Sequence, residues 1–215
     1  MASPLLSVVD NPQIPALRRL LKEAYCVFDF IVLEVAAEAR VDLQLHREAL
    51  DALYRQLQEE ACEARRRLRQ DPRYADIGEP EPMRWEVQRA EARVLDPEQV
   101  QQLAQARPLE GHQGLYRAFL HPPYGTRFAA DGEPPEAIFQ RWLTLLGLEP
   151  QAQPEVIDWV ANLQLDWQAE ETEGPEVLPW SVYFDEGLEW WGVWCLSIWN
   201  PERRTLAVLM ASATD

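Results

Sequence analysis

Residues 189–212, EWWGVWCLSIWNPERRTLAVLMAS, carry the strongest structural signal in the chain. Two runs rich in Val, Leu, Ile and Trp flank NPER at residues 200–203, a sequence typical of a turn between strands. Residues 177–184 have a similar composition, and Asp185-Glu186-Gly187 provides a second turn signal. We therefore expect an antiparallel β-meander over residues 177–213. Its three strands are expected near residues 177–184, 189–199 and 205–212.

The N-terminal third has the periodicity of amphipathic helices. Apolar residues recur every three or four positions between residues 15 and 40, and again between residues 50 and 68. The proline-rich segment 78–82 ends this unit, because proline cannot donate a backbone hydrogen bond within a helix. Two successive amphipathic helices joined by a short link pack against each other in antiparallel fashion. We therefore expect a helical hairpin over residues 15–70.

The middle of the chain, residues 83–165, is expected to be mixed and mainly helical. Helix starts are indicated at Pro97, at Pro134-Pro135 and at Pro154, and Gly147 is a helix stop. With 215 residues, 47% of them hydrophobic, the chain can form one domain over residues 1–215. The predicted fold class is α+β, mostly helical, with an N-terminal helical hairpin and a small C-terminal antiparallel sheet.

The composition argues against several classes of partner. The chain has 20 basic and 36 acidic residues, and a net charge of −16 opposes binding to nucleic acid or to an anionic membrane. The first residues lack the basic region of a secretory signal, and acidic residues interrupt the longest apolar stretch. Three isolated cysteines, Cys26, Cys62 and Cys195, suit a reducing compartment. We therefore expect a cytoplasmic protein with no membrane span.

The acidic residues are concentrated in one interval. The positions from Trp142 to Glu202 contain no Lys or Arg, but they hold 12 of the acids and eight of the nine tryptophans. Carboxylates beside aromatic side chains are suited to binding a cationic protein, because the aromatics supply buried area and the carboxylates pair with Arg and Lys. Two alternatives stay open here: a solvated acidic surface over a Trp-rich core, and a ligand cleft.

The densest part of this interval provides the candidate binding residues. We expect Asp185, Glu186 and Glu189 to pair with charges of a partner, and Trp190 and Trp191 to act as anchors. Neighbouring residues of a strand point to opposite faces, so one of the two tryptophans should point outward. The alternative is that these acids only solubilise the tip of a hairpin.

The sequence contains no specific catalytic motif. GxGxxG, P-loop, GxSxG and HExxH patterns are all missing. His112 and His121 lie in a connection rich in glycine and proline, and His46 is expected on the surface of the helical hairpin. We therefore predict no catalytic residue, no metal site and no cofactor. A small hydrolase that uses a carboxylate with His112 or His121 is kept as an alternative.

The C-terminal residues resemble the end of some bacterial immunity proteins of polymorphic toxin systems. The resemblance rests on residues 189–192, 194–201 and 211–215 and covers about a fifth of the chain. It implies a cytoplasmic, acidic, non-enzymatic protein that binds and occludes a cognate toxin domain. The partner would be a cationic protein, with no nucleic acid and no membrane involved. A related alternative is a nucleic-acid-mimicking inhibitor of a DNA-binding enzyme.

Overall fold

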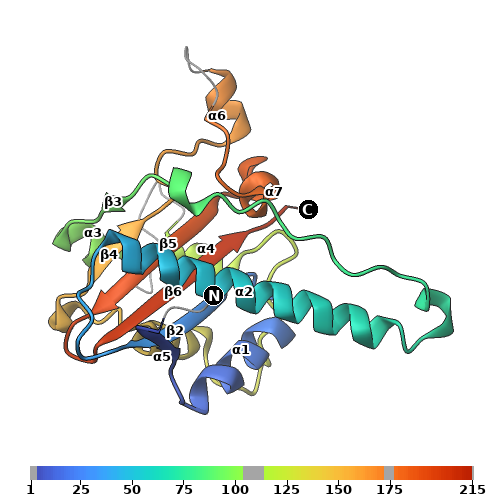
Figure 1. Cartoon of the computed structure of the whole chain (residues 1–215), viewed down its shortest axis with the longest axis horizontal. Helices are drawn as coiled ribbons and strands as arrows, with labels where there is room; N and C mark the ends of the chain where they lie inside the picture. The colour runs from blue at the N-terminus through green and yellow to red at the C-terminus, as the bar shows by residue number, and fades with distance from the viewer. Residues whose placement is uncertain (1–3, 104–113, 172–176, 215) are drawn as a thin grey trace.

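The computed structural model describes residues 4–103, 114–171 and 177–214, and its centre is a six-stranded antiparallel sheet. The strands are β1 (Leu6–Val8), β2 (Asp29–Val35), β3 (Arg93–Val94), β4 (Glu155–Asp158), β5 (Val193–Asn200) and β6 (Thr205–Ser212). Their order across the sheet is β1-β2-β6-β5-β4-β3 (Figure 1). Strand β2 pairs with β6, with Asp29 opposite Met210 and Glu34 opposite Thr205, so the two terminal regions of the chain meet in mid-sheet.

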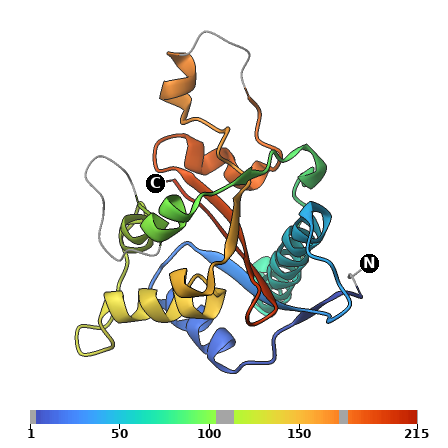
Figure 2. The ribbon, with the colours of Figure 1, turned by 90° about the vertical axis from the view of Figure 1, so that its left-hand side faces the viewer.

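Helices cover both faces of this sheet. Helices α1 (Gln13–Glu23), α4 (Leu115–Leu120) and α5 (Pro135–Leu146) pack on one face, and α2 (Leu43–Leu68) packs on the other (Figure 2). Side chains of β2 alternate between the two cores: Phe30 joins the core under α1 and α5, whereas Ile31 joins the core under α2. The fold is therefore a sheet between two helical layers.

The other elements are short. They are α3 (Pro97–Leu103), α6 (Asp166–Glu170), α7 (Asp185–Leu188), and the 3-10 helices η1 (Pro72–Tyr74), η2 (Val87–Arg89), η3 (Pro150–Ala152) and η4 (Val182–Phe184). The C-terminal half of α2 extends past the edge of the sheet (Figure 1). Within the described residues, no helix is both long enough and apolar enough to cross a membrane.

The expected helical hairpin over residues 15–70 is wrong. The structure has α1, then strand β2, then α2 in this region. Strand β2 is covered by helices on both faces, so it is apolar at consecutive positions from Phe30 to Leu33. A continuous apolar run of this kind also satisfies the three- and four-residue spacing of a helix, and periodicity cannot separate the two structures.

The expected small C-terminal sheet is also wrong. Among the described residues the sheet has six strands from the N-terminal, middle and C-terminal parts of the chain, and two of these, β5 and β6, come from the predicted meander over residues 177–213. The predicted first strand at 177–184 is not a strand: its C-terminal part is η4, and helix α7 follows directly. The helix expected from Pro154 is strand β4. By contrast, α5 begins at Pro135 as predicted, and it ends at Leu146 because the predicted stop, Gly147, caps it with a φ of 76°.

Candidate functional site

One end of the molecule combines exposed carboxylates with exposed apolar side chains. Helices α6 and α7 lie beyond the end of the sheet where β5 begins and β6 finishes (Figures 1 and 2). We call the described residues 166–171 and 177–192 the acidic end. Its exposed acids are Asp166, Glu170, Glu171, Asp185, Glu186 and Glu189. Its exposed apolar side chains are Trp167, Val177, Leu178, Val182 and Trp190.

Helix α7 is fixed to the sheet by buried contacts. The backbone N–H of Gly187 donates to Ser212 Oγ at 2.9 Å, and the N–H of Gly192 donates to Gly187 O at 2.7 Å. Phe184 and Leu188 are buried beneath the helix. The backbone that carries the α7 carboxylates is therefore fixed by these hydrogen bonds and buried side chains.

The predicted binding residues divide between surface and core. Asp185 and Glu186 are exposed in α7, and Glu189 is exposed and accepts a hydrogen bond from the Thr214 hydroxyl at 2.6 Å. Trp190 is 45% exposed, whereas Trp191 is 1% exposed and donates through Nε1 to His121 O at 2.9 Å. One of the two tryptophans is exposed, as expected, but both precede β5, so the predicted strand does not include them. The prediction that Trp191 contacts a partner is wrong, because this side chain is part of the core.

The core accounts for much of the tryptophan content of the basic-free interval. Trp142, Trp159 and Trp180 are also buried, so they serve packing. The interval's acids are divided too. Glu149 forms an ion pair with Arg203 beside the turn between β5 and β6, which is the opposite end of these strands. The interval is therefore not one continuous face, and among its described residues the acidic end brings exposed acids together with exposed aromatics.

His46 is buried, so its expected position on the surface is wrong. Its Nδ1 lies 2.7 Å from Ser197 Oγ, and Nε2 lies 3.5 Å from a Glu155 carboxylate oxygen. Ser197 also accepts a hydrogen bond from Trp159 Nε1. Burial lowers the pKa of His46 to about 4, so the imidazole is neutral near pH 7.

Ser197, His46 and Glu155 lie next to one another as in a hydrolase triad, but His46 Nε2 makes no hydrogen bond to the carboxylate and the serine is not accessible. Ser197 and His46 are both 0% exposed, so no substrate carbonyl can reach the hydroxyl. Sequence reasoning missed this network because the serine and the histidine are 151 positions apart.

The hydrolase alternative gains no support from the other histidines. His121 is exposed, and its backbone carbonyl supports Trp191. His112 lies outside the described residues. In the part of the chain that the structure describes, no group of three His, Cys, Asp or Glu side chains is placed to hold a metal ion.

A partly buried hydrogen bond connects the acidic end to the start of β2. The Tyr183 hydroxyl, in η4, donates to Asp29 Oδ2 at 2.9 Å. Burial is the main cause that raises the pKa of Asp29, to about 6, and the Tyr183 hydrogen bond partly opposes it. No local sequence signal could have paired these residues, because they are 154 positions apart.

Comparisons with known proteins identified no relative of this chain. No protein-family model, no curated protein and no solved structure matches this chain.

Proposed function

We propose that this protein is an inhibitor that binds a cationic protein through the acidic end and occludes its functional surface. An immunity protein acts in this way on its cognate toxin domain. The observation that carries the proposal is the exposed Trp190 beside Asp185, Glu186 and Glu189 on a firmly anchored segment. Rigid presentation favours binding, because less side-chain and loop motion is lost when the partner docks.

The charges and the aromatic side chains have different roles in this proposal. An exposed ion pair contributes only about 0.2–1 kcal/mol, so the carboxylates act mainly by attracting the partner and speeding encounter. A tryptophan that becomes buried in an interface contributes about 2 kcal/mol or more and slows dissociation. Arg84 touches this region, where it donates to Pro179 O, and it also lies 3.9 Å from Glu86. The acidic end therefore keeps a strongly negative balance.

A charge-reversal experiment tests the electrostatic part. The candidate partner is the basic protein encoded beside this chain's gene, and its binding is measured by surface plasmon resonance at two salt concentrations. Reversing Asp185, Glu186 and Glu189 to Lys should slow association by at least about tenfold and flatten the salt dependence. The control reverses three exposed acids elsewhere, Glu38→Lys, Glu81→Lys and Glu91→Lys, which changes the net charge equally.

A truncation pair tests the aromatic part. Trp190→Ala should speed dissociation by about 30-fold, the equivalent of about 2 kcal/mol. Tyr74→Ala, which removes a 43% exposed aromatic in η1 after α2, should leave dissociation unchanged. If both control variants weaken binding as much as the variants of the acidic end, the proposal is refuted.

The same variants have a cellular readout. Co-expression of the wild-type protein should protect cells from the candidate toxin, and the Asp185, Glu186 and Glu189 reversal should abolish protection. Full protection by that variant would show that the interface lies elsewhere.

A further inference from the structure

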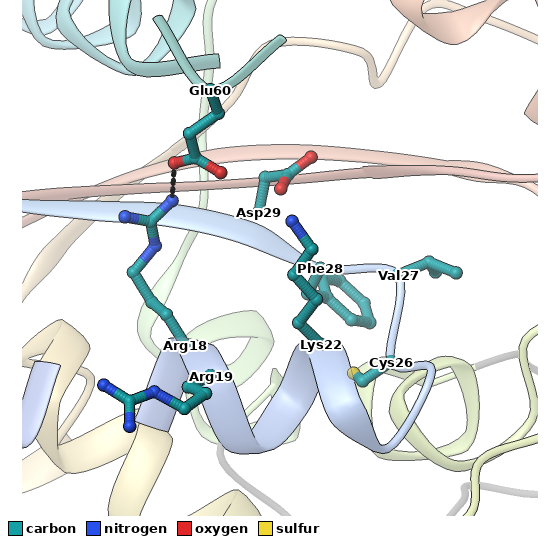
Figure 3. A pocket seen from close by; sticks show the side chains of 8 residues that line it. All are labelled: Arg18, Arg19, Lys22, Cys26, Val27, Phe28, Asp29 and Glu60. Carbon is teal, nitrogen blue, oxygen red and sulfur yellow. Dashed lines mark hydrogen bonds and ion pairs between the residues drawn. The ribbon is translucent and has the colours of Figure 1, made fainter. Parts of the chain in front are cut away.

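A pocket of about 390 Å³ lies between α1, the start of β2 and α2 (Figure 3). Its volume is at the lower end of the range for small-molecule sites, about 300–1,000 Å³. The pocket is separate from α6 and α7, and the proposed inhibitor function makes no use of it.

Positive and negative side chains enter the pocket from opposite sides. Arg18 and Lys22 reach into it from α1, whereas Asp29 from β2 and Glu60 from α2 approach from the opposite side (Figure 3). Arg18 forms an ion pair with Glu60 across the pocket. A ligand in this space would therefore meet cations on one side and carboxylates on the other.

Two of these groups lack an ion-pair partner. Lys22 extends toward Asp29 (Figure 3), but among the described residues neither side chain has an opposite charge within ion-pair distance. Asp29 accepts its hydrogen bond from the neutral Tyr183 hydroxyl. Asp29 is half-buried, and desolvation raises the pKa of its carboxyl more than the charges of Arg18 and Lys22 lower it. A ligand cation beside this carboxylate would lower the cost of its desolvation.

Arg19 also lines the pocket, but its guanidinium points away from Asp29 and Glu60 (Figure 3), and the remaining lining side chains are uncharged. Phe28 is 5% exposed and lines the pocket together with Val27. The Cys26 thiol donates to Phe119 O, and burial raises its pKa to about 12. The thiolate that covalent chemistry requires is therefore not formed near pH 7, so the pocket is suited to reversible binding.

We propose that this pocket binds a small zwitterion with a primary ammonium and a carboxylate, of the size of a free amino acid. The ammonium group lies between Asp29 and Glu60, and the carboxylate lies between Arg18 and Lys22. Both ligand charges are thereby paired with groups that belong to different elements of the fold. A simple cation or a simple anion satisfies only one side of the pocket.

Isothermal titration calorimetry of the full chain tests this assignment. The probes are individual L-amino acids, with an alkylamine and an alkyl carboxylate of matched chain length as half-molecules. At least one amino acid should bind with a Kd of about 1 mM or lower, and both half-molecules should bind at least about tenfold more weakly.

Two variants separate the sides of the pocket. Asp29→Asn keeps an oxygen that accepts from Tyr183 but removes the charge, and Lys22→Gln removes the cation. Each should weaken amino-acid binding by at least about tenfold, whereas Glu23→Gln on the same helix should not change it. Urea denaturation of each variant establishes that the fold is retained. The proposal is overturned if no amino acid binds, if a half-molecule binds equally well, or if folded Asp29→Asn binds like the wild type.

Discussion

Replacing Gly187 by alanine should destabilise the protein, although alanine is the better helix former. A Cβ at this position in α7 would lie 2.4 Å from Gly192 O, 2.7 Å from Ser212 Oγ and 2.9 Å from Val193 Cγ1. The nearest of these atoms belongs to the backbone, so a rotamer change cannot relieve the contact. Either the clash is retained or α7 moves away from the sheet.

Both outcomes have a similar energetic cost. Retaining the clash costs about 1–3 kcal/mol, the usual range for overpacking a filled site. Moving α7 breaks the bonds from Gly187 N to Ser212 Oγ and from Gly192 N to Gly187 O, which contribute about 1 kcal/mol each. The helix propensity of alanine returns up to about 1 kcal/mol. The expected net loss is therefore about 1–2 kcal/mol.

Urea denaturation followed by tryptophan fluorescence measures this loss as a lower midpoint at constant m-value. Gly78→Ala is the matched control, because its Cβ would meet nothing within 4 Å. That variant should be neutral or stabilised by up to about 1 kcal/mol, since alanine restricts the unfolded chain. A Gly187→Ala protein as stable as the Gly78→Ala protein would refute the reasoning about how α7 is seated.

Four further predictions concern the burial of side chains. Burial lowers the pKa of His46 from 6.5 to about 4, so between pH 6.5 and 4 the unfolded state binds more protons than the folded state. As the pH falls through this range, His46 should lower the free energy of unfolding by about 3 kcal/mol. Burial raises the pKa of Asp29 to about 6, so the folded state takes up this proton first as the pH falls, and this uptake offsets part of the loss of stability from His46. Asp29→Asn removes the offset and should steepen the decline in urea midpoints between pH 6.5 and 4.5. An unchanged decline would contradict this prediction. Trp191→Ala should lower the free energy of unfolding by about 3–5 kcal/mol and Trp190→Ala by less than about 1 kcal/mol, and equal losses in the same assay would contradict the burial argument. Asn200→Ala should cost about 1–3 kcal/mol in thermal or urea unfolding, because its buried amide donates to Gly147 O; wild-type stability would show that this bond contributes little.

Local signals predicted the elements that short-range contacts specify. The hairpin of β5 and β6 follows from two β-favouring runs around residues 200–203, because a short turn makes the two strands pair with each other. Helix α5 follows from Pro135 at its start and Gly147 at its end, since both residues act on the backbone next to them. One of Trp190 and Trp191 is exposed, as expected, but the expected reason is wrong: both residues lie in a turn before β5, so strand alternation does not place them.

Only the tertiary structure decided which apolar segments become strands and which residues are exposed. Strand β2 has the apolar spacing of a helix, and it is a strand because β6 pairs along it and helices cover both of its faces. The contact of His46 with Ser197 and of Tyr183 with Asp29 likewise joins distant positions. The acidity of the interval from Trp142 to Glu202 could be counted in the sequence, but the fold divides its carboxylates between opposite ends of β5. The physical reason is that periodicity and turn chemistry act over a few residues, whereas strand pairing and burial depend on segments that meet only in the folded chain.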